Sequence, residues 1–127
     1  MNFNVKKGDD YMQNNVLKFD KESVSIDSNE LLGFLNYDTP ELIKANAILT
    51  IGRYKFSNEY LIDRLYKIAC DANLNKPVLS GLCNSHIACA SLYLLGTDNS
   101  IRRYNEALSQ FNERDKMKIK QFIQSFL

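Results

Sequence analysis

The residues of this chain best suited to chemistry are its only histidine, His86, and its three cysteines. Cys83, His86 and Cys89 follow one another at three-residue spacing, and Cys70 lies upstream of them. Thiolate and imidazole groups are preferred zinc ligands, and four of them complete a tetrahedral site. The same groups could instead supply a nucleophile and its base, if a thiol met the imidazole in an exposed, electropositive pocket.

The spacing of these residues argues against both kinds of site. If residues 83–89 form one helix, their three side chains spread over about 120 degrees of its surface, and a zinc site normally needs a turn to gather them. Small buried cysteines more often pack in a core. An odd number of cysteines without an export signal also indicates free thiols in a reducing compartment. We therefore expect no metal ligands and no catalytic residues here.

Other catalytic signatures are missing from the sequence. It contains no Gly-rich phosphate loop, no GxSxG or HExxH motif, and no pair of acids placed as general acid and base. We expect a chain that is not an enzyme, that carries no cofactor and that has no small-molecule substrate.

Composition narrows the possible partners. Sixteen Lys and Arg against fifteen Asp and Glu give a formal charge of +1, and 45% of the residues are hydrophobic. Such a composition is typical of one globular core, and the near-neutral charge does not steer a protein towards nucleic acid or an anionic membrane. No apolar stretch approaches the roughly 20 residues that span a bilayer. We expect a cytoplasmic protein that does not bind membranes, and the charge does not favour nucleic acid as its partner.

The signals for the start of a helix are clearest at residues 38–41. Asp38 or Thr39 can accept hydrogen bonds from the first turn, Pro40 needs no N–H there, and Glu41 complements the positive end of the helix. Apolar residues then recur at three- and four-residue steps as far as Gly52. The apolar face is broad, so we expect this helix to be central.

A second segment repeats this pattern. Moving residues 87–96 back so that Ile87 meets Ile43 also aligns Cys89 with Ala45, Ser91 with Ala47 and Gly96 with Gly52. Small residues along one row allow a neighbouring helix to come close, and the glycine is expected to end each helix in a left-handed conformation.

The remaining elements complete a helical chain with short turns. Further helices are expected over Glu30–Asn36 after a Ser28 cap, Ser57–Asp71 after a Ser57-Asn58 cap, Asp98–Phe111 with Asp98 as the cap, and Glu113–Phe126 after an Asn112 cap. A loop runs around Asn73–Ser80. Residues 1–27 are rich in Asn, Lys and Asp, and are expected to form a polar arm or a capping helix.

Helix pairs with a period of about 40 to 47 residues are typical of the HEAT and armadillo class. Residues 39–52 and 87–96 resemble the B helices of HEAT repeats, and the resemblance extends over residues 28–127. It implies an all-α fold, a HEAT-like α-α superhelix, that is a short α-solenoid of about three helical hairpins. Lys44 stands where such repeats often carry a basic residue but Ala88 takes that place in the second copy, so the polar ladder between repeats would be incomplete.

A stack of helical hairpins offers a continuous strip of side chains and needs no cleft, which favours a non-catalytic protein-binding module. The chain is similar to HEAT-like immunity proteins of polymorphic and contact-dependent growth-inhibition toxin systems. This resemblance implies a bacterial protein that binds a cognate toxin domain, such as a nuclease, and blocks its active site. The alternatives are an adaptor or scaffold in a larger assembly and a nucleic-acid-binding helical repeat.

Two short clusters combine cations with tyrosine, which is frequent at energetically important interface positions. The expected partner-binding residues are Arg53, Tyr54 and Lys55 at a helix end, and Arg102, Arg103 and Tyr104. Residues 100–127 carry six cations against three acids, a balance of +3. The polar outer face of a last repeat would have the same character without any function.

Overall fold

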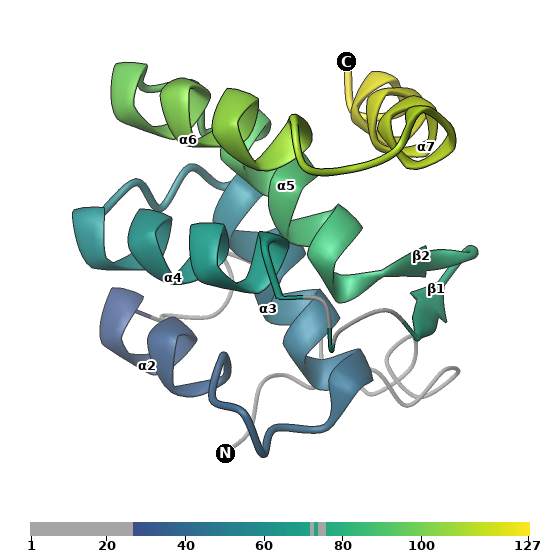
Figure 1. Ribbon diagram of the computed structural model, residues 1–127. Helices are drawn as coiled ribbons and strands as arrows, with labels where there is room; N and C mark the ends of the chain where they lie inside the picture. The colour runs from purple at the N-terminus through teal and green to yellow at the C-terminus, as the bar shows by residue number, and fades with distance from the viewer. Residues whose placement is uncertain (1–26, 72, 74–75) are drawn as a thin grey trace.

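The structure is a computed structural model that describes residues 27–71, 73 and 76–127. Its elements in this part of the chain are α2 (Ser28–Gly33), α3 (Glu41–Arg53), α4 (Glu59–Ala69), β1 (Pro77–Leu79), β2 (Leu82–Cys83), α5 (Asn84–Leu95), α6 (Asp98–Leu108) and α7 (Glu113–Gln124) (Figure 1). The expectation of a mainly helical chain is confirmed. Of the proposed arm, residues 1–27, only Asp27 lies within the described residues.

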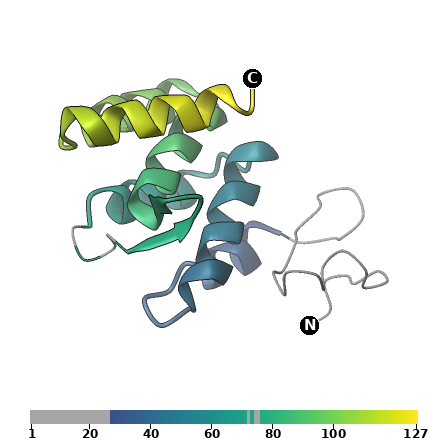
Figure 2. The ribbon, with the colours of Figure 1, turned by 90° about the vertical axis from the view of Figure 1, so that its right-hand side faces the viewer.

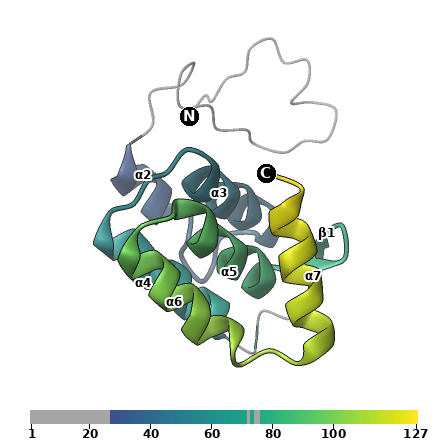
Figure 3. The same ribbon diagram turned by 90° about the horizontal axis from the view of Figure 1, so that it is seen from above.

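The helices form two layers. In Figure 1, α2, α4 and α6 are stacked on one side, and α3 and α5 pack behind them. Seen from above, α5 lies between α6 and α7 (Figure 3). Helix α5 packs against α3, α4, α6 and α7, and all of its residues except Tyr93 are buried. The expectation that α3 is the central helix was therefore wrong. Short side chains around the whole circumference of α5 let four helices approach it.

Helices α3 and α5 approach closely at the small residues identified in the sequence. The Ser91 hydroxyl donates to the Ile48 carbonyl oxygen at 2.9 Å. A Cβ atom added to Gly52 would lie 2.8 Å from Ser91 Oγ and 3.0 Å from Ser91 Cα. The small-residue rows therefore do set the spacing of these two helices.

The helix-ending role expected of both repeat glycines holds at only one of them. Gly96 follows α5 in the left-handed region with φ 71°. Gly52 instead lies inside α3, which continues to Arg53, and the left-handed residue after it is Lys55 with φ 60°. The shared pattern thus has two different causes, a cap at Gly96 and a close helix contact at Gly52.

Helix starts differ from the expected caps by about one residue. Asp27 caps α2 in a capping box with Glu30, while Ser28 Oγ donates to the Asn58 side chain at 2.7 Å. Thr97 caps α6 in place of Asp98, and the Asn112 cap of α7 is confirmed. Two adjacent cap-forming residues compete at each start, and tertiary packing decides between them.

Two expected side-chain caps do not form. At α3 the capping position is Pro40 itself, with ψ 140°, and neither Asp38 nor Thr39 caps the helix. At α4 the capping residue is Asn58, but its side chain makes no cap hydrogen bond because it accepts from Ser28.

A β-hairpin occupies part of the segment that was expected to be a loop. Strands β1 and β2 pair antiparallel, with Leu79 opposite Leu82, and they lie beside α3 and α5 (Figure 2). Ser80 and Gly81 between them have φ 53° and 78°, the pattern of a type I′ turn. The Ser-Gly pair is a turn signal, but strands this short leave no readable alternation. Strand β2 ends at Cys83, which is also the N-cap of α5. Across the described ranges, every helix is too short or too polar to cross a membrane.

Candidate functional site

Of the histidine and cysteines identified in the sequence, Cys83 and His86 lie at the buried start of α5, Cys89 lies in the middle of that helix, and the partly buried Cys70 follows the end of α4. The imidazole Nδ1 of His86 accepts from the backbone N–H of Cys83 at 3.0 Å. Its Nε2 lies 3.5 Å from a carboxylate oxygen of Asp115 on α7, and its ring packs 5.4 Å from that of Phe111. Both ring nitrogens are turned towards other groups, so neither is placed to take a proton from a thiol.

The cysteines are poor candidates for ligands or nucleophiles in these surroundings. All three thiols are free, and Cys83 and Cys89 are buried. Burial, with a smaller effect of Cys70, raises the pKa of Cys89 to about 12, and burial also raises the pKa of Cys83. The reactive and metal-binding form of cysteine is the thiolate, which these environments disfavour. Within the described ranges, no group of three or more His, Cys, Asp or Glu residues is placed to hold a metal ion.

A cleft of about 370 Å³ lies where the end of α4, the start of α5 and the α6–α7 turn meet. Its lining comprises Ala69, Cys70, Asp71, Ser85, Gln110, Phe111, Asn112 and Asp115. Asp115 turns towards His86, Asp71 accepts from the backbone N–H of Asn73, and Asn112 caps α7. These polar groups are thus engaged in holding helix ends together, and the cleft does not assemble a nucleophile, a base and an oxyanion site.

The buried imidazole should make stability depend on pH. Burial lowers the pKa of His86, opposed by the smaller effect of Asp115, while Lys118 lowers it further. The unfolded chain then binds the proton more readily. The contribution of neutral His86 is therefore complete above the unfolded pKa of 6.5 and is lost as pH falls through the folded pKa.

We expect the free energy of unfolding, measured by urea titration, to fall as the pH is lowered below about 6.5. The matched variant is His86→Asn, because an asparagine oxygen can still accept from Cys83 N–H but does not titrate. Its decline should be shallower. Parallel curves for the two proteins would show that His86 is not the group responsible.

The first predicted binding cluster lies where the ends of α3, α5 and α7 meet. The exposed Arg53 guanidinium lies 5.7 Å from the ring centre of Tyr54 and 5.8 Å from that of Phe126, beyond the end of α7. The amine of Lys55 donates to the carbonyl oxygen of Leu94 in the last turn of α5. We call Arg53, Tyr54, Lys55 and Phe126 the Arg53 surface. The sequence identified three of its members and missed Phe126, which is distant in the chain.

The second predicted cluster is used largely within the fold. Arg103 lies 3.4 Å from an Asp63 carboxylate oxygen, and its guanidinium stacks 4.5 Å from the Tyr66 ring centre. Tyr104 is only 7% exposed and packs edge-on against Tyr93. Arg102 is exposed but pairs with Glu106 on the same helix. This cluster joins α6 to α4 and α5, and of its three residues only Arg102 is exposed.

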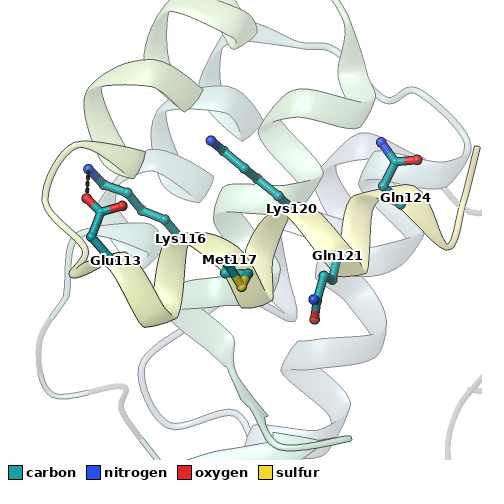
Figure 4. A pocket seen from close by; sticks show the side chains of 6 residues that line it. All are labelled: Glu113, Lys116, Met117, Lys120, Gln121 and Gln124. Atoms are coloured by element: carbon teal, nitrogen blue, oxygen red, sulfur yellow. Dashed lines mark hydrogen bonds and ion pairs between the residues drawn. The ribbon is translucent and has the colours of Figure 1, made fainter.

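One further surface was not singled out in the sequence. A hollow of about 220 Å³ lies on the outer face of α7, and its lining residues are Glu113, Lys116, Met117, Lys120, Gln121 and Gln124 (Figure 4). We call these residues the α7 stripe. They recur at three- and four-residue steps. In the sequence, the signal that could have identified them is the apolar Met117 among polar neighbours. Its side of α7 is opposite Ile119 and Ile123, which are buried.

Comparison of the chain with protein-family models, with curated proteins and with solved structures finds no match.

Proposed function

We propose that this chain is a non-catalytic protein-binding module, and specifically an immunity protein that binds a cognate toxin domain in the bacterial cytoplasm and blocks its active site. The observation that carries the proposal is the Arg53 surface, where an exposed cation lies within 6 Å of the centres of two aromatic rings contributed by different segments. Arginine and tyrosine are among the residue types enriched at interface positions with large binding contributions.

The geometry of Arg53 suits it to hold a carboxylate of a partner. Cation–π contacts with Tyr54 and Phe126 restrict the guanidinium of the exposed Arg53, so less side-chain freedom is lost on binding. Within residues 27–71, 73 and 76–127, neither Arg53 nor Lys55 forms an ion pair with a carboxylate. An acidic group on the partner would supply that charge.

We also propose that the two helical layers are a short HEAT-like solenoid with the hairpins α2–α3, α4–α5 and α6–α7. The support is the close contact of α3 and α5 at Gly52 and Ser91, and a polar link in which the Asn84 amide donates to the Glu41 carboxylate at 2.7 Å. The buried Lys44 pairs with Glu41 of its own helix at 3.6 Å. Because α5 is covered on all sides, binding would use helix ends and the outer face of α7, not a strip along α5.

The direct test is to co-express the chain with the toxin domain encoded beside its gene. We expect growth to be rescued and a stable one-to-one complex to be recovered by size-exclusion chromatography. An unrelated toxin domain expressed at the same level is the control and should not be neutralised. Failure to rescue growth, or the lack of a stable complex, would contradict the proposal.

A further inference from the structure

We propose that the α7 stripe docks an amphipathic helix of the partner protein whose flanks carry carboxylates. This inference rests on the proposed function, because it assigns the kind of segment that the partner would present. The stripe runs along the full length of α7, which is about 16 Å for its eleven helical steps. That length matches two to three turns of a docked helix.

The hollow in the stripe provides an apolar anchor point. Met117 is 61% exposed and is the only apolar residue of the α7 stripe. In Figure 4, Lys120 and Gln124 rise from one edge of α7, Gln121 leaves the other edge, and Met117 lies between them. Methionine adapts its shape to different apolar groups, so it suits a surface that receives a side chain from a partner.

The charges around Met117 select an acidic occupant. The partly buried Lys116 and the exposed Lys120 belong to the stripe, and Arg114 and Lys118, which lie beside it in the sequence, are exposed. Glu113 is the only acid of the stripe, and it already pairs with Lys116 at 3.4 Å. The other acid of α7, Asp115, turns inward to His86. Complementary charge on the partner would both attract it and fix its orientation.

A helix is the occupant that this surface fits. Side chains at three- and four-residue steps form ridges that accept the ridges of another helix, as the inner face of α7 already does against α5. The stripe presents no strand edge for an extended peptide. A nucleic acid would use the lysines but would gain little from Met117, because phosphate contacts need only cations.

The inference can be tested on the full chain with two synthetic helical peptides that share one leucine stripe and differ only in carrying Glu or Lys on both flanks. The chain has three methionines, and Met117 is the one in the described part, so the ¹³C-methyl spectrum is simple and Met117→Leu assigns its signal. We expect the Glu peptide to shift the Met117 signal and to bind at least roughly tenfold more tightly than the Lys peptide.

Charge reversal supplies the decisive comparison. The double variant Lys116→Glu, Lys120→Glu should prefer the Lys peptide, and the control Lys67→Glu, at an exposed site on α4, should keep the original preference. The inference would be overturned if both peptides bound equally well, or if the Glu peptide bound without shifting the Met117 signal. It would also be overturned if a DNA duplex bound as tightly as the Glu peptide. Self-association of the chain through Met117 would also overturn it, because a second copy would then be the occupant.

The same variants separate this inference from the proposed function. If the Lys116→Glu, Lys120→Glu variant still neutralises the toxin as well as the wild type, the α7 stripe is not the docking site, although the immunity function stands. If the wild type binds the Glu peptide at Met117 but rescues no toxin, the docking site stands and the immunity function fails.

Discussion

Replacing Gly52 with alanine is expected to lower the free energy of unfolding by about 2–3 kcal/mol, because the new methyl group enters a helix contact that has no space for it. A Cβ atom at this position would lie 2.8 Å from Ser91 Oγ and 3.0 Å from Ser91 Cα, which is backbone. Side-chain rotation can relieve the first contact but not the second. Helices α3 and α5 would have to separate, and the Ser91–Ile48 hydrogen bond between them would weaken.

The matched control is Gly33→Ala, because a Cβ atom at Gly33 meets nothing within 4 Å. Both glycines lie in helices, and alanine has the higher helix propensity, so this control should be neutral or more stable by up to about 1 kcal/mol. Urea unfolding followed by circular dichroism gives both values. If Gly52→Ala is no less stable than Gly33→Ala, the close packing of α3 and α5 is not as described.

A double-mutant cycle with Ser91→Gly would locate the effect. Ser91→Gly removes Oγ and Cβ, two of the three atoms nearest to the added methyl group. The double variant should therefore be more stable than the sum of the single effects predicts, whereas additive effects would indicate that the alanine acts elsewhere.

The Gly52–Ser91 contact also illustrates how much of the fold could be predicted from the sequence. The matching small residues correctly indicated that the two segments meet closely. They did not reveal that Gly52 is a contact residue and Gly96 a cap, because both roles favour glycine. The central position of α5 was also hidden, since burial on four sides depends on α6 and α7, which follow it in the chain.

The candidate site was predictable where its residues are adjacent in the chain. Arg53, Tyr54 and Lys55 could be selected because cations and a tyrosine at a helix end favour an interface. Phe126 could not, because only the fold brings it to Arg53. Tyr104 and Arg103 show the same pattern in sequence, yet the burial of Tyr104 and the pairing of Arg103 with Asp63 depend on how α6 packs.

Reversing the charge of Arg53 should show which of the two predicted clusters contacts the toxin domain in the proposed complex. Arg53→Glu is expected to weaken binding of the toxin domain by about 100-fold, since it replaces a pre-organised cation with a charge that repels the acidic partner. The matched control is Arg102→Glu, which makes the same change in net charge at another exposed arginine. Because Arg102 is occupied by Asn99 and Glu106, its reversal should change affinity by less than about threefold.

Calorimetric titration of each variant with the toxin domain measures these effects, and growth rescue provides the cellular counterpart. Both variants change the net charge of the protein by the same amount, so a difference in affinity between them must come from the position of the charge. Equal losses for the two variants would mean that overall charge, and not the Arg53 surface, controls binding. A larger loss for Arg102→Glu would place the interface on α6, at the cluster that the fold otherwise uses to join its own helices.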